Sequence, residues 1–569
     1  MAANENGAES LNFSYSAGNL ISETGSGSGT YTYTYDSNHN LRTAVNDGVT
    51  MGLTYNTSGQ VTESRITATG TSYSLQTSAG YSSDRTFMTS HTDSAGNVTQ
   101  YTENAYGLVG SVTDVASHTT DYSYNTNNDR LIEVSLSNAA GLGYTYSKGL
   151  VNMITRTDST SGESQTYTFT YNSYGTVTAV KVGNTTLASY TYMAKNGPLT
   201  GITYGNGDTI TYTYDALGRV STESHDGVLT YRYVYSSNGD LARKEELNSS
   251  GSVIKAACYE YDSLDRLIRS HEEEKRGSYL YYTTVTEHLY DTSGRITSQS
   301  WALEDGTNRT ETYTYAYDAL GNITQVTENG NAAQYTYDSQ SQLTGVTDSS
   351  GTTVYTYDTA GNIQSISENG TTEKTFSYTN SDWKDQLTAV NGTSLTYDAI
   401  GNPLSYYNGD SSWSFTWSDG RNLAAASDGT TSAAYTYDSN GQRISKTVDG
   451  VTYNYVYLGG QLTEMTWGSH KLEFGYDAQG RPFCCSYDGN NYYYVLNLQG
   501  DVVRIVNYQG TARAEYSYNA WGELTSATGA LADINPLRYR GYVYDNESGF
   551  YYLNSRYYDR AVDILMGLR

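Results

Sequence analysis

The carboxylates that recur along the chain are the first residues to consider for chemistry. Aspartates such as Asp215, Asp318 and Asp358 follow a tyrosine in repeated units of about 20 residues. A carboxylate array of this kind could bind calcium, which takes roughly six to eight oxygen ligands. One aspartate per turn offers few of these oxygens, whereas capping a turn needs only one carboxylate and a nearby backbone amide. We therefore expect turn capping, and calcium binding is the alternative.

The cysteines and histidines have no spacing typical of a metal site. The chain has three cysteines, Cys258, Cys484 and Cys485, without the paired spacing of zinc ligands. The adjacent pair could form a vicinal disulfide, but neighbours in a strand point to opposite faces, so ordinary packing is expected. We predict no metal site and no cofactor. The histidines, expected to be solvated loop residues, are His39, His91, His118, His225, His271, His288 and His470.

Other kinds of chemistry find little support. No nucleophile, base and orienting group stand in a recognisable combination, so we do not expect an enzyme. The glycine-rich piece TGSGSGT from Thr24 lacks the lysine of a phosphate-binding loop. With 33 lysines and arginines against 60 aspartates and glutamates, the chain carries a net charge of −27. This charge repels phosphates, so nucleic acid is not an expected partner.

The chain shows no sign of a targeting or membrane segment. Its start, MAANENGAES, has no basic region followed by an apolar stretch. No apolar run reaches the roughly 18 residues of a membrane helix. We expect neither a signal peptide nor a membrane span, so an exported protein would contain this chain as a fragment or use another route.

Composition indicates one short unit copied many times. Tyrosine occurs 61 times and glycine 56 times, against four prolines and eight phenylalanines. Tyrosine and threonine favour strands, and glycine favours turns. The alternation YTYTYD from Tyr31 to Asp36 puts the tyrosines on one face of a strand and the threonines on the other. The sequence therefore predicts an all-β repeat protein.

Each unit reads as one β-hairpin. The tyrosine ends a strand, the aspartate opens a type I turn, and the glycine three residues later takes a left-handed conformation. An aliphatic residue such as Val220, Ile296, Ile323 or Ile363 then starts the returning strand opposite the tyrosine. The clearest repeat positions are Tyr214, Asp215 and Gly218; Tyr290, Asp291 and Gly294; Tyr317, Asp318 and Gly321; Tyr357, Asp358 and Gly361; and Tyr397, Asp398 and Gly401.

A single hairpin is marginal in water, so the units must stack into one very long antiparallel sheet. Strand twist makes such a sheet coil, and its edges must be covered. A spiral that encloses a hollow barrel meets both demands, and so does a straight solenoid with capped ends. Periodicity alone leaves both open.

The C-terminal part resembles a known family. The motifs YNAWGEL, NPLRYRGY and SGFYYLNSRYYD, together with the upstream YDxxGR/N units, resemble the RHS-repeat-associated core domain that follows tyrosine-aspartate (YD) repeats. Bacterial RHS and wall-associated proteins, toxin-complex C components and, more distantly, teneurins share it. The resemblance implies YD repeats over 1–485, a core domain over 486–559 and a divergent tail over 560–569.

The resemblance also implies a function. In that family the repeats spiral into a cocoon-like shell that holds a C-terminal toxin, and the core domain curls inward to close one end. In toxin-producing members the core is an aspartyl autoprotease with a motif near RxYDPxxGRFxxxDP. Arg556 and Asp559 match its first arginine and aspartate.

The sequence departs from that motif. Arg560 stands in place of the proline, the GRF segment and the final DP are missing, and Asp563 is too near Asp559 to be the second aspartate. Because a two-carboxylate mechanism needs both groups, Arg556 and Asp559 are remnants and no autoproteolysis is expected.

We therefore expect a non-catalytic encapsulating shell of a secreted or cell-surface protein, cut short before its polypeptide cargo. The alternative is a surface module that binds cell-wall carbohydrate. Such modules are rich in tryptophan, and this chain has six.

Overall fold

The fold is all-β, as predicted. The structure, a computed structural model, contains three antiparallel sheets of 35, 14 and 4 strands and one short 3-10 turn, η1 (Tyr539–Gly541), within the residues that it describes. None of the described residues forms a helix with the length and hydropathy to cross a membrane. The described residues are 11–25, 29–46, 48–69, 74–115, 117, 119–136, 140–158, 164–194, 197–205, 207–303, 310–380, 386–398, 401–409, 411–418, 422–438, 441–458, 460–554, 556–559 and 564–566.

Within each sheet, every strand pairs with the next one along the chain. The first sheet comprises β1 (Leu11–Ser16), β2 (Asn19–Gly25), β3 (Gly29–Tyr35), β4 (Leu41–Asn46), β5 (Val49–Tyr55), β6 (Val61–Ala68), β7 (Ser74–Tyr81), β8 (Met88–Thr92), β9 (Val98–Glu103), β10 (Val109–Thr113), β11 (Thr119–Tyr124), β12 (Leu131–Leu136), β13 (Ala140–Ser147), β14 (Leu150–Asp158), β15 (Ser164–Tyr171), β16 (Val177–Val182), β17 (Thr185–Tyr192), β18 (Leu199–Tyr204), β19 (Thr209–Tyr214), β20 (Val220–His225), β21 (Val228–Tyr235), β22 (Leu241–Leu247), β23 (Val253–Tyr261), β24 (Leu267–Arg276), β25 (Tyr279–Tyr290), β26 (Ile296–Leu303), β27 (Thr310–Tyr317), β28 (Ile323–Glu328), β29 (Asn331–Tyr337), β30 (Leu343–Asp348), β31 (Gly351–Tyr357), β32 (Ile363–Glu368), β33 (Thr371–Ser377), β34 (Ala389–Val390) and β35 (Thr393–Ser394).

Two further sheets follow. The second comprises β36 (Thr396–Tyr397), β37 (Pro403–Tyr407), β38 (Ser412–Ser418), β39 (Asn422–Ser427), β40 (Ser432–Tyr437), β41 (Arg443–Val448), β42 (Val451–Leu458), β43 (Gln461–Trp467), β44 (His470–Tyr476), β45 (Pro482–Tyr487), β46 (Asn490–Leu496), β47 (Val502–Asn507), β48 (Ala512–Tyr518) and β49 (Leu524–Thr528). The third comprises β50 (Val543–Asp545), β51 (Phe550–Tyr552), β52 (Tyr557–Asp559) and β53 (Ile564–Met566).

The strand pattern is clearest in β27. Tyr313 and Tyr315 are buried on one face, whereas Thr312 and Thr314 are exposed on the other. The Tyr315 hydroxyl accepts a hydrogen bond from the Leu498 amide at 3.2 Å, so the tyrosine face points toward the later part of the chain. The alternation of tyrosine and threonine therefore separates an inner face from a solvent face.

The turn after each tyrosine has the geometry that its residues favour. Asp318 accepts hydrogen bonds from the backbone amides of Leu320 and Asn322, both at 2.9 Å, while its other oxygen accepts the Asn322 side-chain amide at 2.8 Å. Gly321 has a φ of 89°, and Tyr317 lies opposite Ile323. Both carboxylate oxygens thus accept N–H groups, which is the turn-capping role. Equivalent contacts occur at Asp215, Asp291, Asp358 and Asp398.

Replacing Gly321 with valine should lower the melting temperature, with a cost of about 1–3 kcal/mol, because a β-branched residue is strained at positive φ. A Cβ at Gly321 would meet nothing within 4 Å, so the effect isolates the backbone. Gly321→Asn is the control, and it should cost less. Other repeats place His39, Asp265 and Ser341 at this position, with φ of 67°, 59° and 61°. Thermal unfolding of both variants measures the difference, and equal melting temperatures would refute the assignment.

The repeated tyrosine has a second role that the sequence did not reveal. Its hydroxyl donates a hydrogen bond to the carbonyl of the aliphatic residue that closed the preceding unit. Tyr337 bonds Ile323 at 2.8 Å, and Tyr357 bonds Leu343 at 2.7 Å. Each unit is therefore tied to the one before it by a side-chain bond as well as by the strand ladder.

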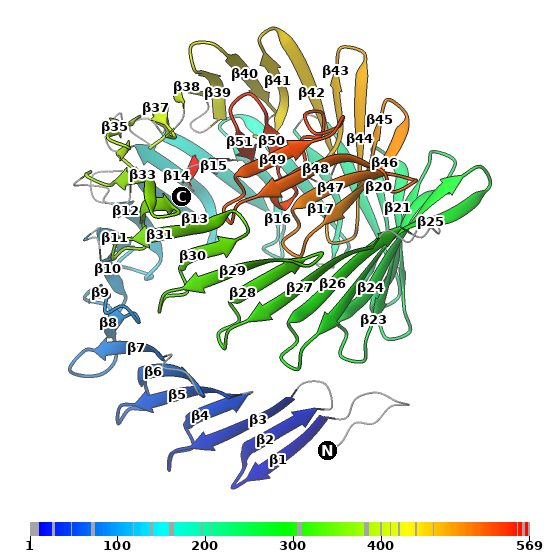
Figure 1. Ribbon diagram of the computed structural model, residues 1–569. Helices are drawn as coiled ribbons and strands as arrows, with labels where there is room; N and C mark the ends of the chain where they lie inside the picture. Colours follow the sequence, from blue (N-terminus) through cyan, green and yellow to red (C-terminus); the bar gives the residue numbers. More distant parts are fainter. Residues whose placement is uncertain are drawn as a thin grey trace.

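The long sheet coils and does not close edge to edge into a barrel (Figure 1). Successive coils meet through the ends of their hairpins: Ser94 donates to the Ser339 carbonyl at 3.3 Å, and Asn97 donates to the Thr359 carbonyl at 2.6 Å. The spiral expected from strand twist is thus confirmed, and the two contacts join residues 245 and 262 positions apart in the chain. At the blue end in Figure 1, β1 to β5 lie apart from the later coils.

The C-terminal part turns inward, so that three layers lie on one another: the first sheet outside, the second sheet in the middle and the last residues inside. Alternate residues of β45 and β46 point opposite ways: Cys484 and Tyr493 pack with Trp301 of the first sheet, whereas Cys485 and Tyr494 join the core. Behind that core lie the described residues of 529–566, here called the inner plug, which Figure 1 shows in red within the coil. The expected boundary between 485 and 486 falls inside β45, so the second sheet runs across it.

Candidate functional site

The remnant autoprotease residues lie in the inner plug. Asp559 ends β52 and is 1% exposed. Burial and the nearby Asp559 carboxylate raise the pKa of Tyr406. Arg556 is half-buried, and its carbonyl accepts the Leu553 amide at 2.8 Å, one residue before β52 begins. Asp563 lies outside the described residues.

A fully buried ion pair joins the plug to the second sheet. Arg443 begins β41 of the second sheet, and Asp545 ends β50 of the plug. The two guanidinium nitrogens Nη1 and Nη2 donate to the two carboxylate oxygens at 2.6 and 2.9 Å. Both side chains are 0% exposed. This forked arrangement orients the plug as well as holding it.

A second cation and a second carboxylate extend this pair. Lys446 donates to Asp545 at 2.9 Å and to Glu547 at 2.8 Å. Burial alone would raise the pKa of Asp545, but the charges of Arg443 and Lys446 outweigh it and the pKa is lowered. Burial and the adjacent Asp545 raise the pKa of Glu547. The two carboxylates therefore balance the two cations in a site where Arg443 and Asp545 are 0% exposed and Lys446 and Glu547 are 8% and 6% exposed.

Tyrosines surround the guanidinium of Arg443. Its central carbon lies 4.4 Å from the ring centre of Tyr552 and 5.1 Å from that of Tyr455, with Tyr435 and Tyr557 at 5.4 and 5.9 Å. Cation–π attraction is strongest where the cation is desolvated, as here. The rings of Tyr435 and Tyr455 belong to the second sheet, and those of Tyr552 and Tyr557 belong to the plug. The arginine therefore contacts both parts.

Sequence reasoning missed this site, although one signal was present. Arg443 stands two residues after Gly441, at the position that holds Ile323 in the unit of Gly321. A charged residue at a position that is otherwise aliphatic breaks the repeat pattern. Such a break indicates a contact made outside the repeat itself.

A second arginine shapes the plug from within. Arg538, from the motif NPLRYRGY, is 1% exposed and lies 4.1 Å from the ring centre of Tyr544. It donates to the Ala532 carbonyl at 2.8 Å and to Asn546 at 2.7 Å. Its own carbonyl accepts the Val502 amide at 3.0 Å, which attaches the motif to β47.

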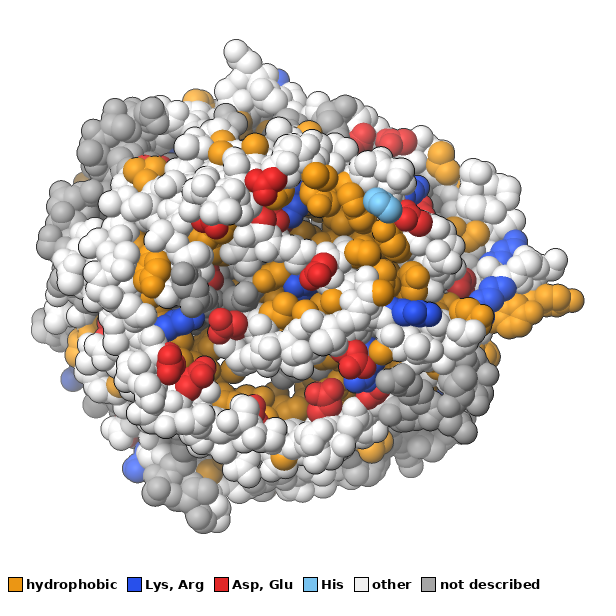
Figure 2. All heavy atoms as spheres, turned by 45° about the horizontal axis from the view of Figure 1, so that its top comes forward, with side chains coloured by type: hydrophobic (Ala, Val, Ile, Leu, Met, Phe, Trp, Pro, Cys, Tyr) orange, Lys and Arg blue, Asp and Glu red, His pale blue; other side chains and the backbone are white. Residues whose placement is uncertain are grey.

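The hollow of the coil is partly occupied by the chain itself. Figure 2 brings the top of Figure 1 forward and shows a rim around a hollow whose middle is filled, with acidic side chains gathered around it. The plug packs through Phe550 against Trp413 and Phe415 of β38, with ring centres 5.9 and 6.0 Å apart. The arrangement can hold an inner segment in place, and the charged groups of Arg443, Lys446, Asp545 and Glu547 pair with one another.

The cysteine prediction is confirmed, and part of the histidine prediction is wrong. Cys484 and Cys485 are free and buried on opposite faces of β45. All the histidines were expected in solvated loops, but five of those in the described residues lie in strands: His91, His225, His271, His288 and His470. His225 and His288 are 7% and 5% exposed because later layers cover them. His118 lies outside the described residues.

Comparison with known proteins agrees with this architecture. The model of the teneurin YD-shell family matches residues 283–353 and 330–566, and that of the RHS repeat matches 15–50 and 195–228. The tRNA3(Ser)-specific nuclease WapA of Bacillus spizizenii is 28% identical over 61% of this chain, and the tRNA nuclease WapA of Bacillus subtilis strain 168 is 31% identical over 44%. The matched parts cover 14% and 10% of those relatives.

Solved structures of toxin complexes share the fold. The crystal structure of TcdB2-TccC3 without its hypervariable C-terminal region superposes with a TM-score of 0.69 at 15% identity, over 98% of this chain and 34% of that one. The Tc holotoxin pore of Photorhabdus luminescens gives 0.54 at 15% identity, over 99% and 32%. The repeat pattern, the coiled sheet, the inner plug and these matches agree, and the chain belongs to the RHS/YD-repeat family of shell proteins.

Proposed function

We propose that this chain is the wall and inner plug of a shell that encloses a polypeptide cargo. The observation that carries the proposal is the buried Arg443–Asp545 pair, which holds the plug inside the coil. A buried ion pair can hold its two partners in one orientation. The Arg443–Asp545 pair would therefore keep the plug in place while the shell contains its cargo. Relatives carry nuclease names, so a toxin domain is the kind of cargo that a longer protein of this family would hold.

We further propose that the shell itself is not catalytic. Asp559 is buried beside Tyr406, while Asp545 and Glu547 are occupied by Arg443 and Lys446. An aspartyl mechanism needs two carboxylates that share one proton. The burial and pairing of these carboxylates and the departures from the autoprotease motif both support a shell without catalytic activity.

Protection from protease tests the enclosure. A flexible peptide with a specific protease site and an epitope tag is fused after residue 569, and the same peptide is fused before residue 1 in a matched control. Because β53 pairs with β52 in the plug and β1 lies apart from the later coils, the C-terminal tag should be cut far more slowly than the N-terminal one. Intact mass should show cleavage only at the added site.

Two outcomes would contradict the proposal. Equal cleavage of both tags would show that the coil encloses nothing, whereas cleavage without protease would show that the shell is catalytic. The surface-binding alternative stays a prediction, and a pull-down on purified cell wall checks it.

A further inference from the structure

Two neighbouring strands of the first sheet, β23 and β24, bring a thiol, an imidazole and a carboxylate together. Cys258 of β23 lies opposite His271 of β24, and Glu273 is two residues further along β24 on the same face. The neighbouring Tyr259 points the other way, where its hydroxyl accepts the Ala478 amide of the next layer at 2.6 Å. The cluster therefore lies on the face of the first sheet that is turned away from the second sheet.

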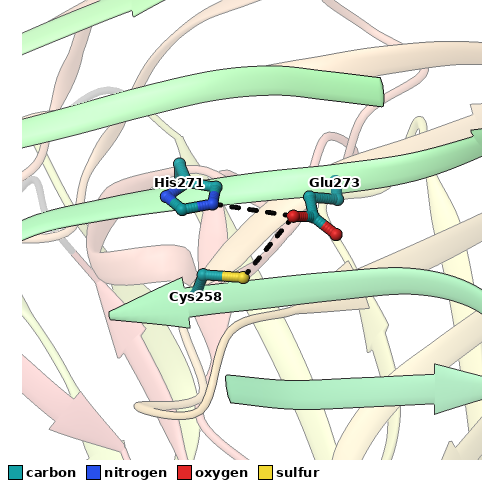
Figure 3. Close-up of side chains that lie close together, drawn as sticks. All are labelled: Cys258, His271 and Glu273. Atoms are coloured by element: carbon teal, nitrogen blue, oxygen red, sulfur yellow. Dashed lines mark hydrogen bonds and ion pairs between the residues drawn. The ribbon is translucent and has the colours of Figure 1, made fainter. Parts of the chain in front are cut away.

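The donor atoms are close enough together to bind one metal ion. The Glu273 oxygen Oε1 lies 3.8 Å from Cys258 Sγ and 3.7 Å from His271 Nε2, and Figure 3 shows both side chains turned toward it. All three donor atoms lie within 4.8 Å of one another. Tetrahedral zinc with ordinary bond lengths places such atoms about 3.3–3.6 Å apart. The two distances to Glu273 Oε1 need to shorten by only a few tenths of an ångström on that scale, and the thiol and the imidazole need to approach each other around the ion.

The surroundings hold the carboxylate in this orientation. Arg243 of β22 donates through Nη2 to the other oxygen of Glu273 at 2.6 Å, and through Nη1 to the Cys258 sulfur at 2.9 Å. Outer hydrogen bonds of this type orient metal ligands and stabilise thiolates. The ring of His271 meets Tyr282 edge-on, with centres 4.7 Å apart.

The charges also permit a cation. Arg243 pairs with Glu245 at 2.9 Å, and Arg232 pairs with the same carboxylate at 2.5 Å. Once Cys258 is ionised, three negative groups face two positive ones. The side chains of His271 and Glu273 are each 12% exposed, so the cluster is enclosed but reachable by a small ion.

We propose that Cys258, His271 and Glu273 form a zinc site that cross-links β23 to β24 at the base of the long β24–β25 hairpin. The Cys258 S–H bond breaks as the S–Zn bond forms, and the proton leaves to solvent. Three protein ligands leave the fourth position to water. The alternative is that these three side chains serve only the hydrogen-bonded network with Arg243 described above. This alternative predicts no specific metal binding.

Cobalt titration of the chelator-treated full chain tests the site. One equivalent of Co²⁺ should give four-coordinate visible bands and a thiolate charge-transfer band, and Zn²⁺ should displace both. Cys258→Ser should abolish the charge-transfer band. His271→Gln and Glu273→Gln should each weaken binding by at least about 100-fold, since loss of an outer-shell partner alone costs about 10–100-fold.

The matched control is His470→Gln, because His470 is a 45% exposed strand histidine paired with Asp488. It should bind Co²⁺ as the parent does. Where Cys258→Ser fails to fold, mass-mapped alkylation of the parent replaces it, and Zn²⁺ should protect Cys258 from the reagent. Binding unchanged in His271→Gln, or no stoichiometric binding by the parent, would overturn the proposal.

Discussion

Replacing Asp545 with asparagine should lower the free energy of unfolding by about 3–5 kcal/mol, because the Arg443 guanidinium then stays buried without its counter-ion. Lys446 keeps Glu547, so the loss comes mainly from Arg443. The amide is nearly isosteric with the carboxylate, which separates the loss of charge from any loss of packing. Denaturant unfolding followed by tryptophan fluorescence suits the measurement, since Trp413 contacts Phe550 of the plug.

The matched control is Asp215→Asn, which breaks a partly exposed arginine–aspartate pair within a single turn. Arg219 and Asp215 are 29% and 26% exposed and lie 2.7 Å apart. Exposed pairs contribute about 0–1 kcal/mol, and asparagine already caps this turn at Asn56 and Asn172. Equal losses in the two variants would show that the buried pair does not hold the plug. Hydrogen exchange should rise in β50 and β51 of Asp545→Asn alone.

The repeat could be predicted from the sequence because its causes are local. The alternation of Tyr313 and Tyr315 with threonines, the capping by Asp318 and the left-handed Gly321 all act within one hairpin. The coil followed from strand twist. The length of chain in one coil could not be predicted, because it is set by contacts such as that of Asn97 with Thr359, which are 262 residues apart.

The two sites could not be predicted in the same way. Arg443 and Asp545 are 102 residues apart, and only the inward turn of the chain brings them together. Cys258 and His271 are close in sequence, but the register of β23 against β24 decides whether they face each other. A one-residue slip would have put His271 on the opposite face. Spacing alone therefore showed neither the ion pair nor the thiol–imidazole pair.

Replacing Glu272 with glutamine should stabilise the chain by about 3 kcal/mol at pH 8 and by little at pH 4.5. Glu272 faces the second sheet and lines a cavity of about 30 Å³ that Asp477 and Arg481 also line. Burial raises its pKa to about 7, from an ordinary value of 4.5. Between these two values the folded chain holds a proton that the unfolded chain releases, so stability falls as pH rises through this window. Above pH 7 the full cost of the buried charge is present, and glutamine removes it.

The adjacent Glu273 provides a control of opposite sign. Burial alone would raise its pKa, but the hydrogen bond and charge of Arg243 outweigh burial and the pKa is lowered. Glu273→Gln should therefore destabilise the metal-free chain at pH 8, where Glu272→Gln stabilises it. Melting temperatures of the parent and both variants from pH 4.5 to pH 8 give the comparison. A parallel pH dependence in the parent and Glu272→Gln would mean that Glu272 is already ionised in the fold, with water or Arg481 compensating its charge.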